Sequence, residues 1–376
     1  MSENTGTGDS DFGRAAVPIL AGSWRSCFRR SIRHLHERVK LSMDPSDETT
    51  GGEAYRVREQ NPATSSSRPP KAATIRQITT TPNLFTGDGR VHRFDAADRE
   101  RIDQLFRPGD STSALICGDT DAVLSSLPEC SFQSCITSPP YWSLRDYNIP
   151  GQIGLESSVS DYIDHLAKVF AQVRRVLKDD GTLWLNIGDS YTSGGRTWRA
   201  TDKKNPVRAM NLRPPTPDGL KPKDLVGVPW LLAFALQKEG WYLRADIIWN
   251  KPNCQPESVK DRPTRSHEYI FLFSKSEHYR YDPAAVRGPN GRNLRTVWDI
   301  PTRPYAEAHF ATFPSALVEP CMKLASSPHD LILDPFVGAG TTGLVALKLD
   351  RRFVGIELNP SYLQIAESRL NGDLIR

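Results

Sequence analysis

A glycine turn joins a short apolar run to a helical pattern, an arrangement typical of a parallel α/β sheet. The segment 334–342 (DPFVGAGTT) follows the apolar residues 331–333 and opens the helical pattern 341–349. Glycines at such a turn let the backbone approach a ligand closely, and the helix N-terminus offers unpaired N–H groups. The next apolar run, 353–356, is followed by Glu357, and an acid about 20 residues after such a turn binds the ribose of a nucleoside. The sequence therefore predicts a nucleoside-binding sheet edge.

Short apolar runs and helical patterns alternate along most of the chain. The runs predicted as strands are 114–117, 134–137, 182–187, 242–250, 268–274, 331–333 and 353–356. The patterns predicted as helices are 162–177, 229–238, 313–325, 341–349 and 360–370. This alternation is typical of an α/β domain with a mostly parallel sheet.

The remaining segments set the predicted domain boundaries. Residues 1–75 are rich in Ser, Thr, Gly, Pro and charge, which predicts a disordered or linker extension before a domain over 76–376. Segment 192–224 carries eight Lys/Arg against three acidic residues, and segment 282–308 is rich in Arg, Pro and Asn. We expect both to be insertions at the functional edge of the sheet.

Composition excludes several classes of protein. The 376 residues include 48 Lys+Arg against 44 Asp+Glu, and a net charge of +4 does not by itself indicate a nucleic-acid partner. The six cysteines are scattered without a CxxC pair, so we expect reduced thiols, no disulfide scaffold and no metal site. No apolar run approaches the roughly 20 residues that cross a bilayer, and the N-terminus lacks a basic leader. We therefore expect a cytoplasmic protein.

A second turn carries groups suited to an exocyclic amine. The sequence Ser138-Pro139-Pro140-Tyr141 follows the predicted strand 134–137. Two prolines fix the backbone and leave carbonyls that accept hydrogen bonds, and the Ser138 hydroxyl adds another acceptor. The Tyr141 ring offers a face on which a flat base can stack.

Together, these segments resemble the amino-methylating DNA methyltransferases, and the Ser-Pro-Pro-Tyr version resembles the enzymes that act on N4 of cytosine. The similarity covers residues 115–370, and the catalytic turn precedes the cofactor turn, as in the β group of these enzymes. The matching segments are 117–119 (CGD), 137–147 (TSPPYWSLRDY), 183–191 (LWLNIGDSY), 246–253 (DIIWNKPN), 309–314 (HFATFP) and 334–342.

The resemblance implies a fold, a cofactor and a set of site residues. It implies a Rossmann-like sheet with helices on both faces, a circularly permuted motif order and a small target-recognition insertion, which fits 282–308. The cofactor would be S-adenosylmethionine. Its methionine part would contact Asp334, Phe336, Gly338, Gly340 and Thr341. Its ribose would contact Glu357, Asp119 would lie near the adenine, and Phe313 and Pro314 would close over it.

By the same resemblance, Ser138, Pro139, Pro140 and Tyr141 would hold a base flipped out of double-stranded DNA, with positioning and charge stabilisation supplying most of the acceleration. A cognate restriction endonuclease is a candidate partner. Basic residues that would contact DNA phosphates are Arg196, Arg199, Lys203, Lys204, Arg292 and Arg295.

Several alternatives remain open. An N6-adenine methyltransferase needs similar amine geometry, and a DNA-binding protein of this fold without activity would keep the same outline. Gly338, Gly340 and Gly343 also match the GxGxxG spacing of nicotinamide-dependent dehydrogenases, although that function leaves the Ser-Pro-Pro-Tyr turn unexplained. A C5-cytosine enzyme needs a nucleophilic cysteine, whereas Cys321 lies in an apolar helical pattern. The pair His267-Glu268 lacks the HExxH spacing of a zinc site.

Overall fold

The computed structural model describes residues 91–107, 109–110, 112–192, 216–302 and 313–372. All of them belong to the unit that spans Pro82–Arg376. The predicted extension 1–75 lies outside the described residues. So do most of the basic segment 192–224 and the end of segment 282–308.

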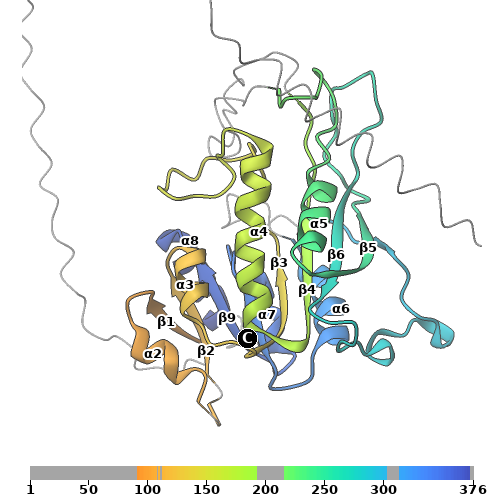
Figure 1. The fold of residues 1–376 in the computed structure, drawn as a ribbon. Coiled ribbons are helices and arrows are strands. Elements are labelled where there is room, and N and C mark those ends of the chain that lie inside the picture. Colours follow the sequence, from red (N-terminus) through yellow and green to blue (C-terminus); the bar gives the residue numbers. More distant parts are fainter. Residues whose placement is uncertain (1–90, 108, 111, 193–215, 303–312, 373–376) are drawn as a thin grey trace, which may run out of the picture. The chain divides into compact units, whose positions relative to one another are not determined.

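The described residues form one sheet of nine strands in the order β1-β2-β9-β8-β3-β4-β6-β5-β7 (Figure 1). Neighbours are parallel from β1 through β4, β6 is antiparallel to both β4 and β5, and β7 is parallel to β5. The strands are β1 (Val91–Asp95), β2 (Ser113–Cys117), β3 (Phe132–Thr137), β4 (Leu177–Ile187), β5 (Tyr242–Asn250), β6 (His267–Ser274), β7 (Val297–Asp299), β8 (Leu331–Asp334) and β9 (Arg352–Glu357). The prediction of a mostly parallel sheet is confirmed.

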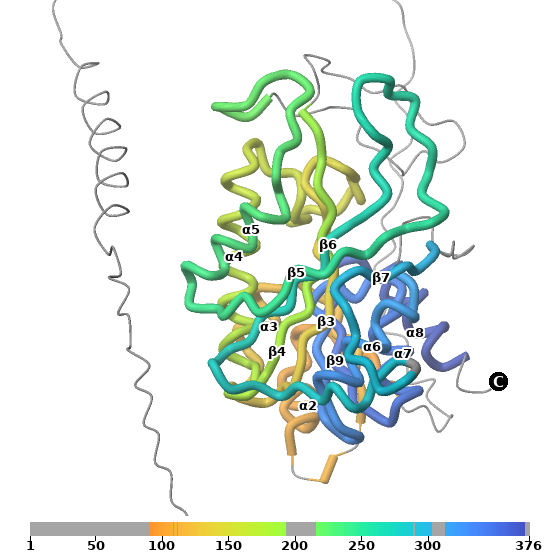
Figure 2. The backbone as a smooth tube through the Cα atoms, turned by 90° about the vertical axis from the view of Figure 1, so that its right-hand side faces the viewer, coloured from red at the N-terminus to blue at the C-terminus, as the bar shows by residue number. Residues whose placement is uncertain are grey.

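Helices cover both faces of the sheet, as Figures 1 and 2 show. One core contains side chains of α3, α4 and α5, and the other contains side chains of α6, α7 and α8. Successive side chains of β2 point to opposite faces of the sheet, so that Ala114 and Ile116 pack in the first core and Leu115 in the second. The helices are α2 (Arg99–Gln104), α3 (Thr120–Ser126), α4 (Val159–Val176), α5 (Val228–Lys238), α6 (Ser315–Ala325), α7 (Thr341–Lys348) and α8 (Pro360–Gly372).

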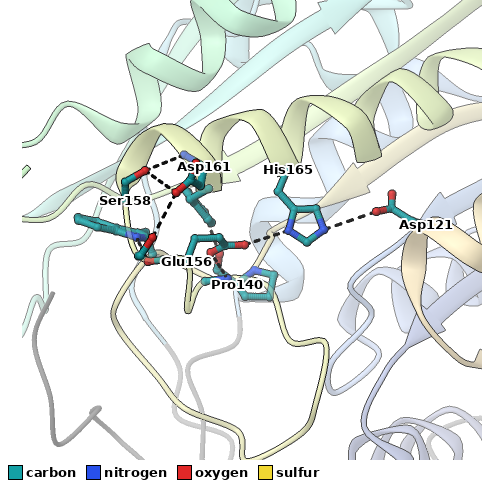
Figure 3. A network of polar contacts seen from close by, with 10 residues as sticks. Asp121, Pro140, Glu156, Ser158, Asp161 and His165 are labelled. Atoms are coloured by element: carbon teal, nitrogen blue, oxygen red, sulfur yellow. Dashed lines mark hydrogen bonds and ion pairs between the residues drawn. The ribbon is translucent and has the colours of Figure 1, made fainter. Parts of the chain in front are cut away.

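The longest helix, α4, has a clear start signal. The Ser158 side chain accepts a hydrogen bond from the Asp161 backbone N–H at 3.1 Å, and its hydroxyl donates to the Asp161 carboxylate at 2.7 Å (Figure 3). This reciprocal cap satisfies one of the unpaired N–H groups of the first turn. Leu166, Phe170 and Val173 are fully buried on one face, which anchors α4 on the sheet.

The two predicted turns meet at one edge of the sheet. Strands β3 and β8 are parallel neighbours, with Cys135 opposite Leu333. From β8 the chain crosses through α7 to β9, and from β3 it crosses through α4 to β4 on the other side. The strand order therefore reverses between β8 and β3, which is where ligands bind in open α/β sheets.

Some elements differ from the prediction. The helix expected over 313–325 begins at Ser315, because Pro314 has an extended backbone at the N-cap. Strand β4 begins at Leu177 rather than at 182. The described part of segment 282–308 holds two short 3₁₀ turns, Pro283–Val286 and Pro289–Gly291, and then β7, which extends the sheet beside β5. None of the helices described here is long and apolar enough to cross a membrane.

Candidate active site

A cavity of about 870 Å³ opens at the carboxyl ends of the central strands. Its volume lies in the range of small-molecule sites, roughly 300–1,000 Å³. Both predicted turns contribute to its wall. The predicted site residues that line it are Asp119, Ser138, Pro139, Pro140, Tyr141, Phe313, Phe336, Gly338, Thr341 and Glu357. Pro314, Asp334 and Gly340 are near the site but are not part of this lining.

The glycine turn adopts the conformation that its glycines predict. Gly338 and Gly340 have φ of 50° and 78°, in the left-handed region that favours glycine. The Gly338 N–H donates to Glu357 Oε2 at 3.0 Å, and the Asn359 N–H donates to Glu357 Oε1 at 2.9 Å. An ionised carboxylate has about four lone-pair sites, so these two bonds leave acceptor capacity for hydroxyl groups. Glu357 is therefore fixed in place and still able to accept from a ribose.

Gly340 packs closely against helix α8. A Cβ at this position would lie 3.2 Å from the Cβ of Ala366, on helix α8. From the same helix, Arg369 donates to the Ala339 carbonyl and to the Thr341 hydroxyl, both at 3.0 Å. The glycine turn is thus held from behind by α8.

Asp334 lies beneath the turn and joins the two strands. It is 1% exposed and accepts from the Thr137 hydroxyl at 2.6 Å and from the Phe336 N–H at 3.1 Å. Burial raises its pKa to about 6, although these hydrogen bonds lower it. The Thr137 bond ties the end of β3 to the end of β8. Asp334 thus supports both turns, and its contact with a cofactor stays a prediction.

The loop after β2 is also tied to the glycine turn. Asp119 caps α3 by accepting from the Ala122 N–H at 3.0 Å, while it lines the cavity. The adjacent Thr120 hydroxyl donates to the Pro335 carbonyl at 2.9 Å. Thr120 lines the cavity as well, although no sequence pattern indicated it.

The Ser-Pro-Pro-Tyr turn is anchored by α4. The Tyr162 hydroxyl, fully buried, donates to the Pro140 carbonyl at 2.8 Å (Figure 3). Burial raises the pKa of Tyr162 above its ordinary value, which keeps the hydroxyl a donor. The turn is therefore oriented by a hydrogen bond from the core of the domain.

A polar network holds the segment that follows the turn. The Glu156 carboxylate accepts from the Gly154 N–H at 2.8 Å and lies 3.0 Å from His165 Nδ1 (Figure 3). His165 Nε2 lies 3.5 Å from the Asp121 carboxylate on α3. The Glu156 carbonyl accepts from the indole N–H of Trp142 at 3.1 Å. These contacts connect the residues after the turn to α3 and α4.

Three residues that sequence patterns did not indicate as functional lie behind Tyr141. The Tyr141 hydroxyl donates to Glu268 Oε2 at 2.8 Å, and Asn186 Nδ2 donates to the same oxygen at 3.2 Å. The Lys251 ammonium forms an ion pair with Glu268 Oε1. In the sequence, Glu268 stands out only through the pair His267-Glu268, which lacks the spacing of a zinc site. The signal that could have found it is a carboxylate at the start of the apolar run 268–274.

The predicted DNA-contacting residues fall into two groups. Arg292 and Arg295 are exposed and do not line the cavity. The other four, Arg196, Arg199, Lys203 and Lys204, lie outside the described residues.

The comparisons with known proteins identify the family. A family model described as DNA methylase matches residues 132–368. The chain belongs to this DNA methylase family. The Type II methyltransferase M.Cfr9I of Citrobacter freundii is 59% identical over 265 residues, which cover 69% of this chain and 88% of that protein. The Type II methyltransferase M.SmaI of Serratia marcescens is 60% identical over 262 residues, which cover 68% of this chain and 90% of that protein.

A solved structure confirms the fold. The PvuII DNA methyltransferase (cytosine-N4-specific) superposes with a TM-score of 0.54 at 23% identity, over 68% of this chain and 86% of that one. The Rossmann-like methyltransferase sheet expected from the resemblance is therefore confirmed.

Membership in the DNA methylase family identifies the cofactor as S-adenosylmethionine and sets the dehydrogenase alternative aside. The residues present fit this cationic nucleoside. The cavity has two left-handed glycines near its wall and the carboxylates of Glu357 and Asp119 for hydroxyl and amine groups. Phe313 and Phe336 add aromatic surface. The sulfonium, ribose and adenine parts of the cofactor all find suitable chemistry here.

The protonation state of Glu357 gives a first testable prediction. Burial raises the pKa of Glu357 to about 7. Because the ionised carboxylate is the better acceptor for ribose hydroxyls and favours a cationic ligand, S-adenosylmethionine should bind more tightly as the pH rises. We expect its Kd to fall about tenfold between pH 6 and pH 8, measured by isothermal titration calorimetry.

The Glu357→Gln variant is the control for this prediction. Titration of the cofactor and of Asp334 is common to both proteins, so the ratio of the two Kd values isolates Glu357. A ratio that does not change with pH would contradict the assignment. The folding stability of the free protein has the opposite pH dependence. Folding raises the pKa of Glu357 from 4.5 to about 7. Glu357 therefore contributes fully to the free energy of unfolding below pH 4.5, and this contribution is lost as the pH rises through about 7.

Proposed function

We propose that this DNA methylase transfers the methyl group of S-adenosylmethionine to the exocyclic N4 amine of cytosine in double-stranded DNA. The observation that carries the proposal is the meeting of two turns in one cavity. Ser138–Tyr141 follows β3, the cofactor turn follows the adjacent strand β8, and the Thr137–Asp334 hydrogen bond joins the two strand ends. An amine held by one turn would thus lie beside a methyl group held by the other.

The catalytic turn provides acceptors for the amine. A cytosine amine is a poor nucleophile because its lone pair is delocalised into the ring. Hydrogen bonds from the amine to the Ser138 hydroxyl and the Pro139 carbonyl would hold the nitrogen in line and favour pyramidal geometry. Such positioning and charge stabilisation account for much of the acceleration in transfer reactions. The Tyr141 ring would replace the stacking that the base loses when it leaves the duplex.

The cofactor turn holds the donor. S-adenosylmethionine, when bound, supplies an electrophilic methyl group on a sulfonium. Glu357 would accept from the ribose hydroxyls, Asp119 would lie near the adenine, and Phe336, Gly338 and Thr341 would contact the methionine part. Phe313, which precedes α6, would close over the cofactor, whereas Pro314 starts the helix and Asp334 and Gly340 act through the turn itself.

DNA contacts outside the cavity are assigned to basic segments. Arg292 and Arg295 are exposed on the described part of segment 282–308, which we propose as the target-recognition region. Arg196, Arg199, Lys203 and Lys204 are proposed to contact phosphates, each adding salt-dependent affinity. Relatives named Type II methyltransferases support a cognate restriction endonuclease as a companion enzyme.

The base assignment is tested by product analysis. The purified protein would be incubated with mixed-sequence duplex DNA and S-adenosylmethionine, and the DNA digested to nucleosides for mass spectrometry. The proposal predicts N4-methylcytosine. N6-methyladenine would keep the fold and the family and overturn the base assignment. No methylated nucleoside from protein that binds the cofactor would overturn the proposed activity.

A further inference from the structure

A network of three side chains fixes the hydroxyl end of Tyr141. Glu268, at the start of β6, accepts from the Tyr141 hydroxyl at 2.8 Å. Lys251, directly after β5, forms an ion pair with the other carboxylate oxygen of Glu268. Asn186, near the end of β4, donates to Glu268 at 3.2 Å and to the Tyr269 carbonyl at 3.1 Å. Side chains on or directly after three adjacent strands thus form one network, which contacts the Tyr141 hydroxyl through Glu268.

The register of the sheet explains why these groups meet. In the antiparallel pair β5–β6, Glu268 lies opposite Trp249, shortly before Lys251 in the chain. In the pair β4–β6, Asn186 lies opposite Ile270. The Lys251 ammonium also lies 4.3 Å from the centre of the Trp249 ring, which holds the cation near the carboxylate. The network is therefore built into the strand pairing.

The environment of the network makes its contacts strong. The side chains of Lys251 and Glu268 are only 17% and 18% exposed, and Asn186 is 4% exposed. A hydrogen bond from a phenol to an ionised carboxylate is charge-assisted, so it is stronger and more directional than a neutral one. Burial and the charge of Glu268 raise the pKa of Tyr141 above its ordinary value, so Tyr141 remains the donor.

The ring of Tyr141 is also bounded from the side. A Cβ on Gly188 would lie 2.8 Å from Tyr141 Cε2 and 3.3 Å from Glu268 Cγ. Both distances are shorter than an ordinary carbon contact, so only glycine leaves room for the ring and the carboxylate together. With one edge against Gly188 and its hydroxyl on Glu268, the ring has one orientation.

We propose that Glu268, held by Lys251 and Asn186, is a positioning residue that fixes the Tyr141 ring as the wall of the target-base pocket. The inference rests on the proposed function, because that function assigns the Tyr141 ring to the flipped base. Glu268 also lines the cavity, and the role assigned to it is exerted through its hydrogen bond with the Tyr141 hydroxyl. Apart from Tyr141, the contacts of Glu268 named here come from β4, from Gly188 just after it, and from Lys251 directly after β5.

The test is a double-mutant cycle on the chemical step. Glu268→Gln, Tyr141→Phe and the double variant would be compared in single-turnover methyl transfer at saturating DNA and S-adenosylmethionine. Each single variant should slow the step about 10-fold, since small errors of alignment cost one to two orders of magnitude. The double variant should be no slower than Tyr141→Phe alone, because the carboxylate acts through the missing hydroxyl.

Controls separate positioning from folding. Glu277→Gln removes an exposed carboxylate beyond the other end of β6 and should leave the rate unchanged. Affinity for S-adenosylmethionine should stay within about twofold in every variant, because the glycine turn is untouched. If Glu268→Gln fails to fold, the variant Lys251→Met/Glu268→Met replaces the pair by apolar groups and should show the same slow step.

The outcomes are distinct. Effects of Glu268→Gln and Tyr141→Phe that multiply in the double variant would overturn the inference, as would a Glu268→Gln rate equal to that of Glu277→Gln. Wild-type protein that methylates no DNA would instead overturn the proposed function.

Discussion

Replacing Ser138 by alanine is expected to slow methyl transfer by about 100-fold while the affinity for S-adenosylmethionine stays within about twofold. A preorganised hydrogen-bonding group in an active site typically contributes two to three orders of magnitude to the rate. Ser138 lies at the end of β3 in the wall of the cavity, and the cofactor turn lies on the next strand. The loss should therefore appear in the single-turnover rate and not in the Kd of the cofactor.

Ser125→Ala is the matched control for this variant. Ser125 is exposed on α3, where its hydroxyl donates to the Ala122 carbonyl at 2.8 Å. It should methylate DNA at the wild-type rate. If Ser138→Ala weakened cofactor binding as much as it slowed the reaction, Ser138 would belong to the cofactor pocket, contrary to the role proposed for it.

Replacing Gly338 by valine is expected to abolish cofactor binding, with a rise in Kd of at least about 100-fold. Gly338 has a φ of 50°, and a β-branched residue is strained in that region. Its N–H also positions Glu357 through a bond of 3.0 Å. A valine here would place its side chain at the cavity wall and would also displace the Glu357 carboxylate. Equilibrium dialysis with labelled S-adenosylmethionine measures the effect.

Backbone strain alone is controlled by Gly219→Val. Gly219 has a φ of 82° and is exposed, and a Cβ added there would meet no heavy atom within 4 Å. The strain is comparable at both positions, but only Gly338 lines the cavity. Equal cofactor affinity in the two variants would show that the glycine turn does not hold the cofactor.

Much of the site could be predicted from sequence because its signals are local. Each turn directly follows an apolar run, and the carboxyl ends of parallel strands meet at one edge of a sheet. The strand and helix patterns around 331–357 are therefore sufficient to place the glycine turn and Glu357 at that edge. The fold class is predictable in the same way, because short apolar runs that alternate with helical patterns indicate a parallel sheet.

The residues that sequence patterns missed depend on long-range register. Glu268, Lys251 and Asn186 meet only because β6 lies antiparallel between β4 and β5, and nothing in their local sequence shows that pairing. The same reason explains Asp334, whose partner Thr137 is far away in the chain. The edge strands β1 (VHRFD) and β7 (VWD) were missed because their sequences hold no apolar run like those of β2 (SALIC) and β8 (LILD).

An isotope label can follow the methyl group from S-adenosylmethionine to the base. Wild-type protein and Ser138→Ala would be incubated with duplex DNA and S-adenosylmethionine carrying a trideuterated methyl group, and the digested nucleosides analysed by mass spectrometry. We expect trideuterated N4-methylcytosine from the wild type and about 100-fold less from the variant, which still binds the cofactor. Labelled product formed equally by both proteins, or label on another atom of DNA, would contradict this expectation.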